Sequence, residues 1–159
     1  MAEYPDEFAV ILPDPYLTAI GKVCVAWGHL EQIVDLAITK FAGYDMFDPR
    51  SAILTAHMTW PLKMDVLESL VDAFRGPKYP WLARFDDQVK PLLKRAQEGR
   101  NKVVHGQWGY EDGSAHKARA TARGKLRATI DPITLADIDR IFHDIGRAGM
   151  ELWKLVVNK

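Results

Sequence analysis

The residues of this chain best suited to chemistry are a cation, an amide and an imidazole in one short segment. Arg100, Asn101 and His105 stand together where a long helical pattern ends. Arginine carries a permanent charge on forked donors, and histidine takes or gives a proton near neutral pH. Such groups can cleave a phosphodiester without a metal, because the imidazole moves protons while the guanidinium stabilises charge on the phosphoryl oxygens.

Helical spacing predicts that these three side chains can meet. Asn101 and His105 are four residues apart, so they share a helix face. Arg100 lies about 100° round the helix axis from Asn101, within reach of its long side chain. Gly106 lets the chain turn directly after His105, and the apolar residues 103–104 anchor that turn to a core.

A structural explanation of each residue is also open. A histidine at a helix C-terminus interacts favourably with the helix dipole, and this is the better account of His105 taken alone. Arg100 alone is an exposed helical arginine, and Asn101 alone is a helix-end residue. Only the combination of the three favours a site.

The first helix that must support this cluster is predicted over 14–42. Residues 1–13 lack a helical period and predict an extended lead-in. Asp14 followed by Pro15 is typical of an N-cap carboxylate and a first helical residue, and Gly43 is typical of a helix stop. Apolar residues at helical spacing give this segment one buried face.

Two further helical regions follow. The pattern over 48–74 is interrupted by Pro61, which predicts a kink or two consecutive helices. A third helix is expected over 81–104, ending in the cluster, with Pro91 and Gly99 as flaws within it.

Over 106–132 glycines recur and the helical spacing of apolar residues is lost, which predicts a loop and hairpin insert. Residues 118–121 and 126–130 alternate with period two, and 122–125 can form the turn between them. A final helix is expected over 134–157, opened by a threonine and, three residues later, an aspartate that approximate a capping box. The chain of 159 residues is therefore predicted as one all-α domain, 1–159, a four- to five-helix bundle with a short β-hairpin before the last helix.

Composition limits the class of protein. Hydrophobic residues make up 48% of the chain and the formal net charge is zero, which favours a compact fold without an overall basic surface. No apolar run approaches the ~20 residues that cross a bilayer, and the acidic start is unlike a signal peptide. The single cysteine, Cys24, lies in an apolar pattern and is expected to be buried, in a protein of the reducing cytoplasm. No metal-ligand spacing is present, so neither a metal nor a cofactor is expected.

The insert concentrates positive charge. No acidic residue stands between Asp112 and Asp131. One interpretation is a phosphate-binding edge that positions RNA without selecting its sequence; the other is a solvated hairpin whose charges prevent edge-to-edge aggregation. Trp108 and Tyr110 can stack on bases or pack under the hairpin. The candidate RNA-binding residues are Lys117, Arg119, Arg123, Lys125 and Arg127.

The arrangement Arg-polar-x-x-x-His at a helix end resembles the motif of the HEPN superfamily (higher eukaryotes and prokaryotes nucleotide-binding domains). Arg100 and His105 match its two defining positions and Asn101 its polar position. The order of long helix, helical pair, motif-bearing helix, insert and final helix is similar to that fold over most of 14–157, and 26–31 resembles its first-helix texture. The resemblance implies a small helical bundle that acts as a homodimeric, metal-independent endoribonuclease.

The same resemblance implies toxin or phage-defence biology, with an antitoxin protein as a candidate partner. One subfamily carries a tyrosine, modified by its antitoxin, two residues after the histidine; Gln107 stands there instead, which puts control of that kind in doubt. Glu31 can orient Arg100 or His105, or simply form an ion pair within the bundle. The alternatives to an enzyme are a noncatalytic HEPN-like module that binds RNA, a nucleotide or a partner protein, and a plain helical dimerisation domain.

Overall fold

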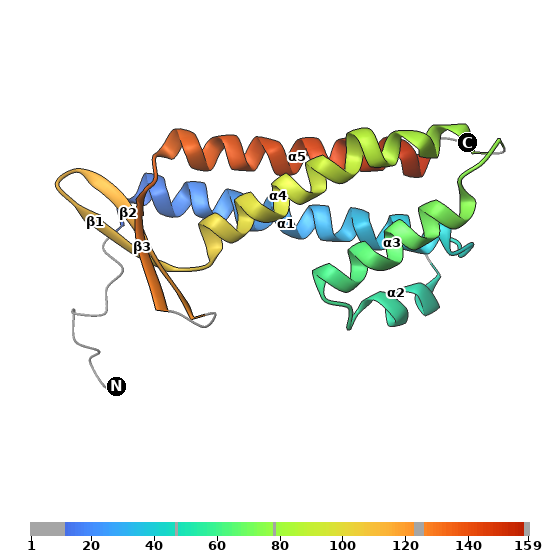
Figure 1. The fold of residues 1–159 in the computed structure, drawn as a ribbon, viewed down its shortest axis with the longest axis horizontal. Coiled ribbons are helices and arrows are strands. Elements are labelled where there is room, and N and C mark those ends of the chain that lie inside the picture. Colours follow the sequence, from blue (N-terminus) through green and yellow to red (C-terminus); the bar gives the residue numbers. More distant parts are fainter. Residues whose placement is uncertain (1–11, 47, 78, 123–125, 158–159) are drawn as a thin grey trace.

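The predicted fold class is confirmed: a helical bundle carries a small antiparallel sheet inserted before its last helix (Figure 1). A computed structural model describes residues 12–46, 48–77, 79–122 and 126–157. Most of the predicted lead-in, residues 1–11, lies outside the described residues.

Three helices run side by side, with the sheet at one end of the bundle and the other two helices toward the opposite end (Figure 1). The helices are α1 (Asp14–Phe41), α2 (Pro49–Thr55), α3 (Trp60–Phe74), α4 (Lys90–Val104) and α5 (Leu135–Val157). A 3-10 turn η2 (Pro80–Ala83) and a π-helical turn η3 (Phe85–Val89) precede α4. The strands are β1 (Gln107–Glu111), β2 (Ser114–Ala122) and β3 (Leu126–Pro132).

The core lies where α5 packs along α1 and α4. Gly99 of α4 permits this close packing, because a Cβ built there would lie 3.0 Å from the Cγ2 of Ile141 on α5. The predicted flaw in α4 is thus a contact point between helices. Large side chains that are fully buried include Leu30, Leu67, Phe85, Leu93, Ile138, Ile145 and Leu152.

Prolines separate the helices largely as predicted. Pro61 stands at the start of α3, so the second helical region is two helices, and the Asp48 side chain caps α2 by accepting from the Arg50 amide at 2.9 Å. The single helix predicted over 81–104 was wrong in its first part. Pro91 has no amide hydrogen for the usual hydrogen bond to the carbonyl four residues earlier. Regular α-helical hydrogen bonding therefore begins only at Lys90, after η2 and η3.

Two expectations about α1 were also wrong. The N-cap residue is Pro13, and no side chain caps the helix, so the Asp14 carboxylate does not act as the cap. Cys24 is exposed, because it lies on the solvent side of the helix, next to the fully buried Val23. The predicted stop is correct: Gly43 follows the last turn with a φ of +83°.

The sheet extends the predicted hairpin by a third strand. β2 and β3 form the expected antiparallel pair, with Ala118 opposite Ile130, and the central turn residues 123–125 lie outside the described residues. β1 was missed, although Asp112-Gly113 is a strong signal for a two-residue turn. Both residues have positive φ, +49° and +77°, and they join β1 to β2 with Glu111 opposite Ser114.

The predicted capping box at the start of α5 is present. The Thr134 amide donates to Asp137 Oδ2, and the Asp137 amide donates to Thr134 Oγ1, each at 3.1 Å. The Thr134 hydroxyl also donates to this carboxylate at 2.7 Å. These hydrogen bonds, first of all that from the Thr134 side chain, hold the pKa of the Asp137 carboxyl below its ordinary value of 3.8.

Replacing Asp137 with alanine is expected to lower the free energy of unfolding by about 1 kcal/mol at pH 7. Because the folded-state pKa is lowered, the carboxylate stabilises the fold above pH 3.8, and this contribution is lost as the pH falls through the lower, folded-state value. Urea unfolding at a series of pH values should show wild type and variant converging in acid. An Asp139→Ala control should change stability by less than about 0.5 kcal/mol at pH 7, and an Asp137→Ala deficit that persists unchanged in acid contradicts this account.

Candidate functional site

The three predicted site residues meet at the C-terminal end of α4. Arg100 Nη1 lies 2.6 Å from His105 Nε2 and donates to Asn101 Oδ1 at 3.2 Å. The guanidinium carbon also lies 5.5 Å from the centre of the Trp27 ring on α1. Arg100 is therefore held by an aromatic face, an amide oxygen and an imidazole at once, which restricts a side chain that is ordinarily free to move.

The donor in this contact is the guanidinium. Because a guanidinium has only donors, a hydrogen bond here requires His105 Nε2 to be the acceptor. His105 is exposed, whereas Arg100 and Asn101 are half-buried. The imidazole is therefore reachable from solvent, with Nε2 beside the guanidinium.

Side chains from the sheet hold the helix end that carries His105. Trp108 Nε1 donates to the carbonyl of Val103 at 3.1 Å, and Lys117 Nζ donates to the carbonyl of Lys102. The last carbonyls of a helix lack partners within the helix, so these two donors act as a C-terminal cap. The Lys117 ammonium also lies 5.4 Å from the centre of the Trp108 ring.

Gly106 makes the turn that allows this capping. Its φ is +127°, and a Cβ there would lie 2.7 Å from Lys117 Cε and 2.8 Å from the carbonyl oxygen of Ala118. Only glycine combines this backbone conformation with so close an approach. The residue after the histidine thus admits Lys117 to the end of α4.

A cavity of about 280 Å³ lies beside His105. Two ammonium groups and two carboxylates line it, so its charges largely balance. Arg100 and Asn101 are not among the described residues that line this cavity. The lining residues are Glu98, Lys102, His105, Lys117, Asp131 and Ile133.

Of the five candidate RNA-binding residues, the structure places three on strands: Lys117 and Arg119 on β2, and Arg127 on β3. Lys117 is only 5% exposed, and its ammonium faces the helix end and the cavity instead of the outer surface of the sheet. Arg119 on β2 pairs with Thr129, and Arg127 on β3 pairs with Thr121. The remaining two basic residues, Arg123 and Lys125, lie outside the described residues.

Glu31 is half-buried on α1. Within the described part of the chain it forms no salt bridge or side-chain hydrogen bond with Arg100 or His105. The α1 residue that does reach the cluster is Trp27, which also packs on Trp60 with ring centres 4.3 Å apart. The sequence shows Trp27 as one more apolar residue at helical spacing, so it gave no signal of this role.

Comparison with known proteins assigns no family to this chain, and the described residues show neither a metal site nor a membrane-spanning helix. No family model, curated protein or solved structure matches this chain. Among the described residues, no group of three or more histidine, cysteine or acidic side chains is placed to hold a metal ion. None of the helices that the structure describes has the length and apolar character needed to cross a membrane.

Substituting Gly106 with alanine is expected to lower the free energy of unfolding by about 2 kcal/mol or more, because the added Cβ meets both a strained φ and two close atoms. Gly109→Ala is the matched control, since no atom lies within 4 Å of a Cβ built there. The control should stay within about 0.5 kcal/mol of wild type in urea unfolding. Equal stability of the two variants would show that the turn tolerates a side chain.

Proposed function

We propose that this protein is a metal-independent endoribonuclease of HEPN type. The observation that carries the proposal is the contact of Arg100 Nη1 with His105 Nε2 at 2.6 Å, with Asn101 on the same guanidinium. Phosphodiester transesterification needs groups that move protons and a cation that stabilises charge on the phosphoryl oxygens, and this contact puts one of each side by side.

The proposed reaction is attack by the ribose 2′-hydroxyl on the adjacent phosphorus. Neutral His105 accepts the hydroxyl proton at Nε2 as the O2′–P bond forms. The P–O5′ bond breaks, and an acid protonates the departing 5′-oxygen. Arg100 turns from the imidazole to the phosphoryl oxygens as their charge grows, while Asn101 holds the guanidinium or the phosphate. The products are a 2′,3′-cyclic phosphate and a 5′-hydroxyl.

One histidine does not readily serve as base and acid in the same turnover. The proposal therefore includes a homodimer in which two copies face each other and the second His105 supplies the proton. The resemblance of Arg100, Asn101 and His105 to the HEPN motif supports this arrangement. It also supports a role in growth control or phage defence, with an antitoxin protein as a partner.

One observation favours a second candidate, a noncatalytic module that binds RNA, a nucleotide or a partner protein. Arg100 already satisfies the Nε2 lone pair of His105, so the cluster is stable without a substrate. In this case RNA binds and is not cut.

Cleavage of total RNA in EDTA separates the two candidates. The wild-type protein is expected to cut, and His105→Ala should slow cleavage about 100-fold or more because proton transfer is lost. Arg100→Ala should slow it by a similar factor through loss of charge stabilisation. RNA with 2′-deoxyribose at the cut positions should stay intact, since it lacks the attacking group.

His143→Ala is the control for the loss of a histidine. His143 is exposed on α5 and contacts only Asp139 among charged groups of the described residues. This variant should cut like wild type. Equal cutting by wild type and His105→Ala would overturn the site, and binding of RNA with no cutting by any variant would favour the module.

The candidate RNA-binding arginines give a separate prediction for RNA affinity. Replacing Arg119, Arg123 and Arg127 with glutamine should weaken binding of single-stranded RNA at least tenfold at low salt and flatten its salt dependence, since fewer counterions are released. Replacing Lys22 and Lys94, exposed on α1 and α4, should change affinity far less. Filter binding at several salt concentrations measures both, and equal effects would favour the charges as a guard against aggregation.

A further inference from the structure

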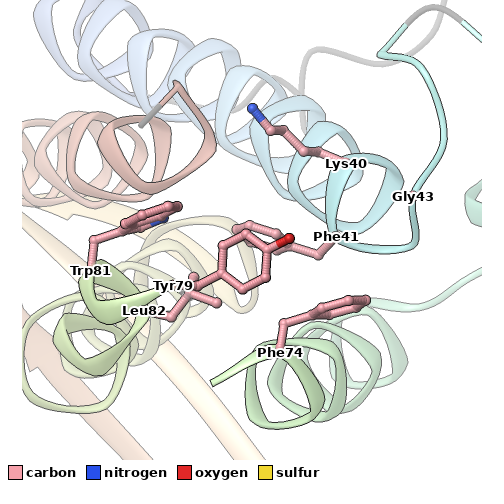
Figure 2. Close-up of a pocket in the computed structure, with 7 residues that line it drawn as sticks. All are labelled: Lys40, Phe41, Gly43, Phe74, Tyr79, Trp81 and Leu82. Atoms are coloured by element: carbon pink, nitrogen blue, oxygen red, sulfur yellow. The ribbon is translucent and has the colours of Figure 1, made fainter. Parts of the chain in front are cut away.

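A second pocket lies at the end of the bundle away from the sheet, where the ends of α1 and α3 meet η2 (Figures 1 and 2). Its volume is about 290 Å³. Four aromatic rings, one lysine and one buried leucine line most of it. These residues are Phe41, Phe74, Tyr79, Trp81, Lys40 and Leu82.

The rings form an edge-to-face series around the hollow. Phe74 and Tyr79 have ring centres 6.1 Å apart, and Tyr79 and Trp81 have ring centres 5.5 Å apart, both nearly perpendicular. Figure 2 shows the rings gathered around one space below Lys40. Phe74 is 42% exposed, so apolar ring surface faces water here, and an apolar occupant that covers it would gain free energy.

Lys40 adds a positive charge at this pocket. The structure gives its ammonium no salt bridge with any described residue. It is not needed at the end of α1 either, because the carbonyls of Ile38, Thr39 and Lys40 already accept from backbone amides at 2.8–3.1 Å. The ammonium is thus available to an anionic group on a ligand.

We propose that this pocket binds a small aromatic carboxylate, a planar system of one or two fused rings with one acidic group. The ring lies among Phe74, Tyr79 and Trp81, and the carboxylate pairs with Lys40. The volume, at the lower end for ligand pockets, fits a ligand of that size. Lys40 opposes the organic cations that aromatic cages otherwise favour, and the apolar walls give a free inorganic anion little to bind. This pocket is independent of the Arg100 cluster.

A nuclear magnetic resonance titration of the full chain with indole-3-acetate tests the proposal. The side-chain indole N–H of Trp81, assigned by its loss in Trp81→Leu, is expected to shift with saturation near or below about 1 mM. Indole-3-acetamide, which keeps the ring and lacks the charge, should bind about fivefold more weakly. The variant Lys40→Gln should bind the two probes equally. Trp81→Leu, followed through the backbone amide of Tyr79 because the indole signal is gone, should weaken both.

Lys22→Gln is the matched control, an exposed lysine on the same helix, and should retain the wild-type preference for the acid. RNA cleavage should be unchanged in Lys40→Gln, which separates this pocket from the proposed ribonuclease site. Equal binding of acid and amide by wild type would overturn the proposal. So would the absence of any shift with either probe at about 5 mM. Tighter binding of adenosine monophosphate than of indole-3-acetate would overturn the assignment to a carboxylate.

Discussion

The end of α4 depends on two side-chain donors from the sheet. The Trp108 side chain donates to the carbonyl of Val103, and the Lys117 side chain donates to that of Lys102. No amide within the helix can satisfy these two carbonyls. This capping joins an insert of strands to a helical bundle, and it fixes where the chain leaves α4. His105 occupies that exit, so its position follows from the cap as much as from the helix.

The candidate site combines parts from separate elements for the same reason. α4 supplies the arginine, amide and imidazole, α1 supplies the Trp27 face under the guanidinium, and the sheet holds the helix end. A catalytic group gains from such support because its correct geometry is present before substrate binds. Substitutions in the sheet or in α1 are therefore expected to displace the cluster even though they change none of its own residues.

Local signals in the sequence predicted much of the fold. Proline and aspartate at helix starts, Gly43 at a helix end and apolar spacing placed four of the main helices, since those signals act within a few residues. Helix geometry predicted that Arg100, Asn101 and His105 could meet, because they lie within five residues at the end of one helix. Contacts between distant segments could not be predicted in this way: nothing local distinguishes Trp27 as the support of Arg100, or identifies Lys117 as a buried cap instead of a surface cation. β1 differs, because its turn signal was present and was overlooked.

Cys24 is the single cysteine of the sequence, and its side chain reaches solvent from α1. A thiol-specific spin label therefore attaches at one known point, with no native thiol to remove first. In an assembly of identical copies, each chain then carries one paramagnetic centre on the same helix that supports Arg100. The separation between those centres reports directly on how the copies are oriented.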